Sequence, residues 1–201
     1  MVFIAVIALI GGILCGRYVF SSDITALFAQ YSDAVLYVLM FSVGISVGMN
    51  RSVFARIRQY HVKIFLIPFG IIAGTILGGF VCSLLLGDPA GESLAVVSGL
   101  GWYSLSGVLV TSMINAQMGS IAFLSSLLRE ILSFLTIPWI ARHLGHWAAI
   151  APAAATSEDT TLPVIMKYTS EDTAVLAVFN GVFCSVMVPV LTKALFEIFS
   201  T

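Results

Sequence analysis

Charged residues are scarce in this chain, and their scarcity sets it apart from soluble proteins. Asp, Glu, Lys and Arg together make up 9% of the 201 residues, whereas about 25% is usual in soluble domains. Hydrophobic residues reach 59%, and the mean hydropathy is +1.06. The composition therefore predicts an all-α integral membrane protein, because a helix satisfies its own backbone polar groups inside a bilayer.

A net positive charge, a cluster of histidines and an even number of cysteines are also lacking, and each absence excludes a class of function. The net charge is -1, so we expect no nucleic-acid binding. Three cysteines in apolar runs predict no disulfide. His143 and His146 lack a third ligand nearby, so no metal site is expected. We also expect no organic cofactor and no enzyme, because no histidine or reactive cysteine joins the acids of the hydrophobic segments.

Long hydrophobic runs fill most of the sequence. A bilayer crossing needs about 20 apolar residues, and the continuous runs of that length are residues 2–20, 31–49, 62–86, 119–140 and 173–199. Residues 94–112 and 147–166 are as long but contain polar stretches with glycine or proline, which predicts broken or re-entrant helices. Residues 1–201 are thus expected to form a polytopic helical bundle, a single transmembrane transporter domain.

The few basic residues predict an orientation. Arg51, Arg56 and Arg58 lie in the connection between the second and third runs, and Lys63 lies at the start of the third run. Because cytoplasmic loops carry the excess of Lys and Arg, this loop should face the cytoplasm. The amino terminus is then cytoplasmic and the carboxyl terminus lies outside.

Glycines recur at four-residue spacing in two of the runs. Gly44 and Gly48 form one row, and Gly70, Gly74 and Gly78 form another. Small residues at this spacing let helices approach closely. Both rows therefore predict helix contact faces, either within one chain or between chains.

Arg129 and Glu130 fall in the middle of an apolar run. Each charge there costs about 2.5 to 3.5 kcal/mol on insertion scales. Adjacent helical residues do not face each other, so each charge needs a partner elsewhere. Serine and threonine residues at helical spacing continue a polar stripe along this run: Ser125, Ser126, Ser133 and Thr136. We expect the stripe to line the bundle interior or a water-filled path.

Partners for this pair are expected in the second interruption. Glu158 and Asp159 occur there beside Thr156 and Ser157. With Glu130, the two acids outnumber the single positive charge of Arg129, which favours binding of a cationic group, a proton or a sodium ion. Glu158 as an ordinary loop acid and Arg129 as part of a structural ion pair stay open as alternatives.

The first interruption has a different composition. Trp102, Tyr103, Ser104 and Ser106 lie among glycines in the stretch SGLGWYSLSG. This setting is typical of an unwound helix that lines a binding site. An interfacial aromatic belt is the alternative for the two aromatic residues.

Three blocks of the sequence together resemble the LysO-type lysine exporter family of bacterial inner-membrane proteins. They are SGLGWYSLSGVLVT, LLRE ending at Glu130, and ATSEDTTLPV, in this order. Arg129 and Glu130 match the family's Arg-Glu pair, and Asp159 matches its acid. Glu158 stands where the resemblance implies an apolar residue, and Ser112 stands where it implies an acid.

The resemblance implies a secondary transporter that exports L-lysine, and basic analogues, across the cell inner membrane, coupled to proton or sodium entry. It also implies an amino-terminal membrane module that this sequence lacks, so we expect a homodimer or a small companion membrane subunit. A sodium/proton antiporter and a channel-like or accessory membrane subunit are the alternative functions.

Overall fold

The computed structural model describes residues 64–200 continuously, together with residues 7, 11, 12, 14–21, 24, 27, 31, 34, 38, 41 and 45. The chain divides into two compact units, Met1–Val43 and Gly44–Thr201. In the first unit, residues 14–18 are helical, and the N–H groups of Val19 and Phe20 both donate to the Cys15 carbonyl at the end of this helix. The predicted runs 2–20 and 31–49 lie largely outside the described residues.

Residues 64–200 of the second unit are helical and contain no β-strand. The elements are α4 (Leu66–Leu86), α5 (Ala90–Val97), α6 (Tyr103–Met113), α7 (Ala116–His143), the 3₁₀ turns η2 (Ala148–Ile150) and η3 (Ala154–Glu158), α8 (Leu162–Tyr168) and α9 (Glu171–Phe199). Helices α4, α7 and α9 are long and apolar enough to cross a membrane. They cover the predicted runs 62–86, 119–140 and 173–199, and the prediction of an all-helical membrane protein is confirmed.

Local signals in the sequence explain where these helices begin and end. Helix α4 stops at Gly87, whose left-handed conformation (φ 75°) is accessible to glycine without strain. The Asn115 side chain accepts from the Met118 N–H and caps the start of α7. Ser170 caps α9 in the same way, by accepting from the Thr173 N–H. These caps fix the ends of the three long helices.

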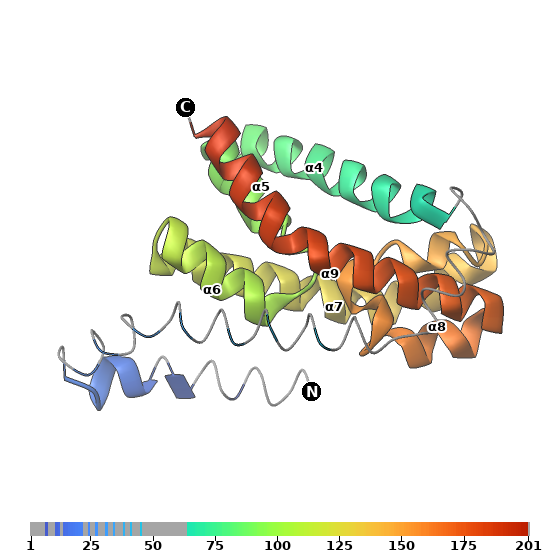
Figure 1. The fold of residues 1–201 in the computed structure, drawn as a ribbon, viewed down its shortest axis with the longest axis horizontal. Helices are drawn as coiled ribbons and strands as arrows, with labels where there is room; N and C mark the ends of the chain where they lie inside the picture. The colour runs from blue at the N-terminus through green and yellow to red at the C-terminus, as the bar shows by residue number, and fades with distance from the viewer. Residues whose placement is uncertain are drawn as a thin grey trace. The chain divides into compact units, whose positions relative to one another are not determined.

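Helix α6 lies alongside α7 (Figure 1). Glycine makes this approach possible, because a Cβ on Gly119 would overlap the Thr111 hydroxyl and one on Gly107 would lie 3.1 Å from Phe123 Cβ. Helix α9 bends along its length (Figure 1), and it contains Pro189, which cannot donate to the carbonyl four residues earlier.

The glycine row of α4 does not pack against any described segment. A Cβ added to Gly70, Gly74 or Gly78 would have no atom of another described segment within 4 Å. Contact is made one residue further round the helix, where a Cβ on Gly79 would lie 2.7 Å from Val97 Cγ2 of α5. Within residues 64–200 this row therefore has no contact, and contact with the rest of the chain or between chains stays a prediction.

A hydrophobic core holds η2, α8 and α9 against the carboxyl-terminal half of α7. Ile137, Ile150 and Ile165 are fully buried there beside Leu176. This core fixes the second interruption next to the middle of α7. The predicted crossing or re-entry of either interrupted segment stays a prediction.

Candidate functional site

The first interruption separates α5 from α6 at residues 98–102. Leu100 adopts φ 49° and Gly101 adopts φ 94°, so the chain turns through two successive left-handed residues. A left-handed conformation is unfavourable for a leucine, which means that packing holds it. Leu100 is 1% exposed.

The second interruption also contains a left-handed residue, where η3 follows η2. Ala154, the first residue of η3, also adopts φ 49°. The N–H of the next residue, Ala155, donates to the Leu100 carbonyl over 3.0 Å. The two interruptions are therefore joined directly through their backbones, at the left-handed Leu100 and at the residue that follows the left-handed Ala154.

Polar side chains of α9 hold the second interruption in place. The Asn180 amide donates to the Ala154 carbonyl and to Ser157 Oγ, each over 3.0 Å. Ser157 Oγ also lies 2.7 Å from the Ala177 carbonyl. Gly181 permits the close approach, because a Cβ there would lie 2.5 Å from the Glu158 nitrogen. Helix α9 thus acts as a fixed support for the residues before Asp159.

Glu130 lies at the centre of α7 and is 0% exposed. Neither of its carboxylate oxygens has a hydrogen-bond partner among the described residues. A buried carboxylate without donors is strongly disfavoured. The Glu130 carboxylate therefore lacks an interaction that a proton, a cation or a hydrogen-bond donor could supply.

Groups from both interruptions lie within electrostatic range of Glu130. Asp159 and Thr160 lie close enough to interact with its carboxylate, and Tyr103 interacts electrostatically with both Glu130 and Asp159. Thr160 Oγ1 is a third buried oxygen without a partner in residues 64–200. Asp159 is exposed, and its carboxylate accepts from the Thr160 N–H. A buried acid and an exposed acid thus share one neighbourhood.

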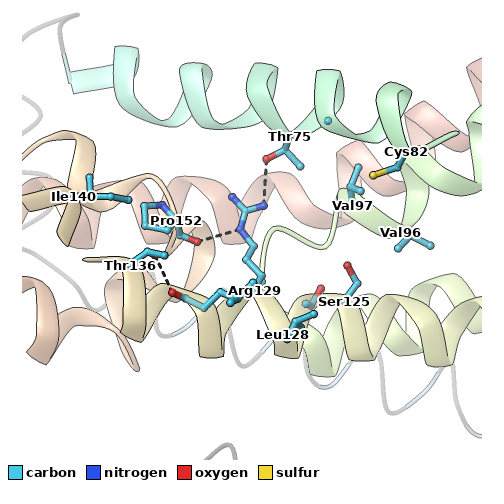
Figure 2. A pocket seen from close by; sticks show the side chains of 14 residues that line it. Thr75, Cys82, Val96, Val97, Ser125, Leu128, Arg129, Thr136, Ile140 and Pro152 are labelled. Carbon is cyan, nitrogen blue, oxygen red and sulfur yellow. Dashed lines mark hydrogen bonds between the residues drawn. The ribbon is translucent and has the colours of Figure 1, made fainter. Parts of the chain in front are cut away.

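Arg129 extends from α7 on another side, between α7 and α4 (Figure 2). Its guanidinium donates to the Pro152 carbonyl (3.1 Å), to Thr75 Oγ1 (3.2 Å) and to the Ala151 carbonyl (3.4 Å). The sequence led us to expect a carboxylate partner for Arg129. Among the described residues all three acceptors are neutral, so this expectation is wrong there. Backbone carbonyls of the second interruption take that place, because the turns around η2 leave them free of helical bonds.

Glu158 has a partner of its own. Its Oε1 accepts from Ser185 Oγ of α9 over 2.8 Å, and the side chain is half-buried. It also interacts electrostatically with Asp159. The residue is therefore fixed against α9 and does not extend freely into solvent like an ordinary loop acid.

The other predicted site residues either form hydrogen bonds within the protein or are at least partly exposed. Thr156 Oγ1 donates to the Ala153 carbonyl over 2.9 Å, and Ser106 pairs with Ser126 of α7 over 3.2 Å. Trp102 is half-buried and Ser104 is exposed. The structure thus brings Glu130, Asp159 and Tyr103 together, and the roles of all ten residues stay predictions.

Three residues that the structure places at this site are not predicted by the sequence pattern. Thr160 belongs to the polar stretch of the second interruption, where nothing distinguishes it from its neighbours. Asn180 and Ser185 are polar residues inside the apolar run 173–199. Their position is the signal that could identify them, because an amide in a hydrophobic span needs polar partners.

Known proteins are similar to this chain over most of its length. A family model described as "Lysine exporter LysO" matches residues 6–196. The chain is 32% identical over 162 residues to "Lysine exporter LysO" of Escherichia coli (strain K12), covering 81% of this chain and 54% of that protein. It is 34% identical over 163 residues to a "Putative lysine exporter" of Haemophilus influenzae, covering 78% of this chain and 80% of that protein.

The chain therefore spans about half the length of the Escherichia coli relative. No solved structure matches it.

Proposed function

Because the chain belongs to the lysine exporter LysO family, we propose that it is a secondary transporter that exports L-lysine from the cytoplasm across the bacterial inner membrane. Basic analogues of lysine would share the route. The family is a transporter family, and three apolar helices agree with a membrane location.

The observation that carries this proposal is the unpartnered carboxylate of Glu130. It is fully buried in the middle of an apolar helix, and both of its oxygens lack donors among the described residues. The ammonium group of lysine offers three donors and a positive charge. A charge-assisted bond to such a group offsets part of the cost of burying the acid.

In this proposal Asp159 forms the outer part of the same site. Because it is exposed while Glu130 is buried, a cation reaches Asp159 first and Glu130 second. Tyr103 and Thr160 supply hydroxyl groups beside the two acids. In this arrangement a proton or a sodium ion competes with the substrate for the two carboxylates, which couples lysine exit to ion entry.

The test is efflux of labelled lysine from reconstituted vesicles. Glu130→Gln and Asp159→Asn should each slow efflux by about tenfold or more, since each removes a charged partner worth about 1.5–3 kcal/mol. Glu197→Gln is the matched control, because Glu197 is an exposed acid that pairs with Lys193 on α9. Transport at the unmodified rate by both site variants would overturn the proposal.

A sodium/proton antiporter is the second candidate, and the same unpartnered acid favours it. The two functions differ in counterflow. Lysine inside the vesicles should accelerate the entry of labelled lysine if the chain is an exporter. Sodium-driven proton movement without any lysine counterflow would instead identify an antiporter.

A homodimer or a companion membrane subunit stays a prediction of the sequence. The test is the mass of the protein in detergent, measured by light scattering, with and without a co-expressed candidate for the companion subunit.

A further inference from the structure

The side of α7 that carries Arg129 borders an open cavity of about 590 Å³. The cavity lies between α4 and α7 and extends to α5, and Arg129 reaches into it (Figure 2). Valine, leucine and isoleucine side chains form much of its wall: Val96, Val97, Leu128, Leu132 and Ile140. A volume of about 300–1,000 Å³ is usual for small-molecule sites.

The charge of Arg129 is not neutralised in the described residues. Its three hydrogen bonds go to two backbone carbonyls and a threonine hydroxyl, all of them neutral. A guanidinium has five N–H donors, so donors remain after these bonds. A positive charge beside apolar walls favours an anion, and the planar guanidinium suits a carboxylate.

Glu130 does not serve this cavity. It is absent from the cavity wall, and so are Asp159 and Thr160, which interact with its carboxylate. Adjacent residues of a helix leave it on different faces. The two charges therefore face two separate sites, and one small molecule does not bridge them.

We propose that the cavity between α4 and α7 is a second ligand site, which takes a small aliphatic carboxylate. The carboxylate binds the free donors of Arg129, and the aliphatic part lies against the apolar walls. Thr75 and the carbonyls of the second interruption orient the guanidinium. The site itself does not depend on lysine export, but its use by the exported amino acid does rest on the proposed function.

Cys82 provides a direct probe, because its exposed thiol lines the same cavity. In a Cys15→Ser/Cys184→Ser background, each labelling rate of Cys82 is divided by the rate of the same reagent with a free thiol in solution, and this relative rate should be at least about threefold higher for an anionic methanethiosulfonate than for its cationic counterpart, because of the Arg129 charge. The preference should disappear in Arg129→Gln and persist in Arg129→Lys. Equal relative rates with both reagents, or no labelling by either, would overturn the proposal.

Protection by ligands tests the chemical class without any change at Arg129, so it stands even if Arg129→Gln does not fold. Hexanoate should slow labelling of Cys82, whereas hexylamine should not. Equal protection by both compounds would show a purely apolar pocket and contradict a carboxylate site.

Lysine and lysinamide separate this site from the proposed function. Protection by lysine but not by lysinamide supports the site and places the exported amino acid in it. Protection by hexanoate alone supports the site even if lysine efflux from vesicles fails. Failure of hexanoate with normal lysine efflux overturns the site alone.

Discussion

The two charged residues at the centre of α7, Arg129 and Glu130, differ in their hydrogen bonding. Arg129 has three hydrogen bonds that tie α7 to α4 and to the second interruption. Glu130, the next residue, is fully buried and has no hydrogen bond among the described residues. The hydrogen bonds of Arg129 join segments of the chain, whereas a buried carboxylate without donors is relieved by a proton, a cation or a donor. One helix thus carries, at adjacent positions, a charge with three hydrogen bonds and an acid with none among the described residues.

Exchanging the two charges should have the largest effect on the stability of the protein. The double variant Arg129→Glu/Glu130→Arg puts a carboxylate opposite the Pro152 and Ala151 carbonyls, where Arg129 now donates. An uncompensated buried charge costs about 3–5 kcal/mol. We expect little folded protein, measured as the monodisperse fraction and thermal midpoint in detergent.

The control exchanges an exposed pair on α9. Lys193 and Glu197 are 3.9 Å apart with side chains 69% and 63% exposed, so Lys193→Glu/Glu197→Lys should leave the thermal midpoint nearly unchanged. Equal stability of the two double variants would show that the sides of α7 do not differ.

Close backbone packing is the second difference between the two sides. Gly181 lies where α9 meets Glu158, and a Cβ there would be 2.5 Å from the Glu158 nitrogen. Gly78 lines the cavity of Arg129, and a Cβ added to it would have nothing within 4 Å in the described residues. Gly181→Ala should therefore destabilise the protein by about 1–3 kcal/mol. Gly78→Ala should be neutral or stabilising by up to about 1 kcal/mol, since alanine favours a helix.

Thermal midpoints of the two alanine variants give the measurement. A shift of about 2–4 °C accompanies each kcal/mol in a domain of this size. A fall for Gly78→Ala as large as that for Gly181→Ala would mean that another segment occupies the cavity. That segment would then be the contact predicted for the glycine row of α4.

Hydrophobicity and local signals predicted much of this fold. The runs 62–86, 119–140 and 173–199 contain α4, α7 and α9 within a few residues, because span length and capping residues such as Asn115 are local properties. α-Helical structure stops at residues 98–102 and again between α7 and α8, inside the segments 94–112 and 147–166, and the broken or re-entrant membrane helices expected there stay a prediction. Glycine, proline and hydroxyl residues mark those places in the sequence.

The partners of Arg129 could not be predicted. A charge count suggests a carboxylate, but a guanidinium bonds equally to carbonyls that a broken helix leaves free. The bond between Ala155 and Leu100 also depends on two left-handed residues. Neither leucine nor alanine indicates that conformation, so only tertiary packing determines it.

The smallest expected effect concerns the link between α4 and Arg129. Thr75→Val removes the acceptor of the 3.2 Å bond from the guanidinium, at a cost of about 0.5–1.5 kcal/mol. Thr136→Val is the matched control, because Thr136 lines the same cavity but donates only to the Leu132 carbonyl of its own helix. The thermal midpoint should fall by a few degrees for Thr75→Val and less for Thr136→Val.

An Arg129→Met background completes this test as a double-mutant cycle. Without a guanidinium, Thr75→Val should lose its effect, whereas the effect of Thr136→Val should stay the same. If Thr75→Val is equally harmful in both backgrounds, Arg129 does not hold α4. The contact of Gly79 with Val97 and Leu94 of α5 would then position α4 by itself, and all donors of Arg129 except those bonded to the second interruption would be free for a ligand.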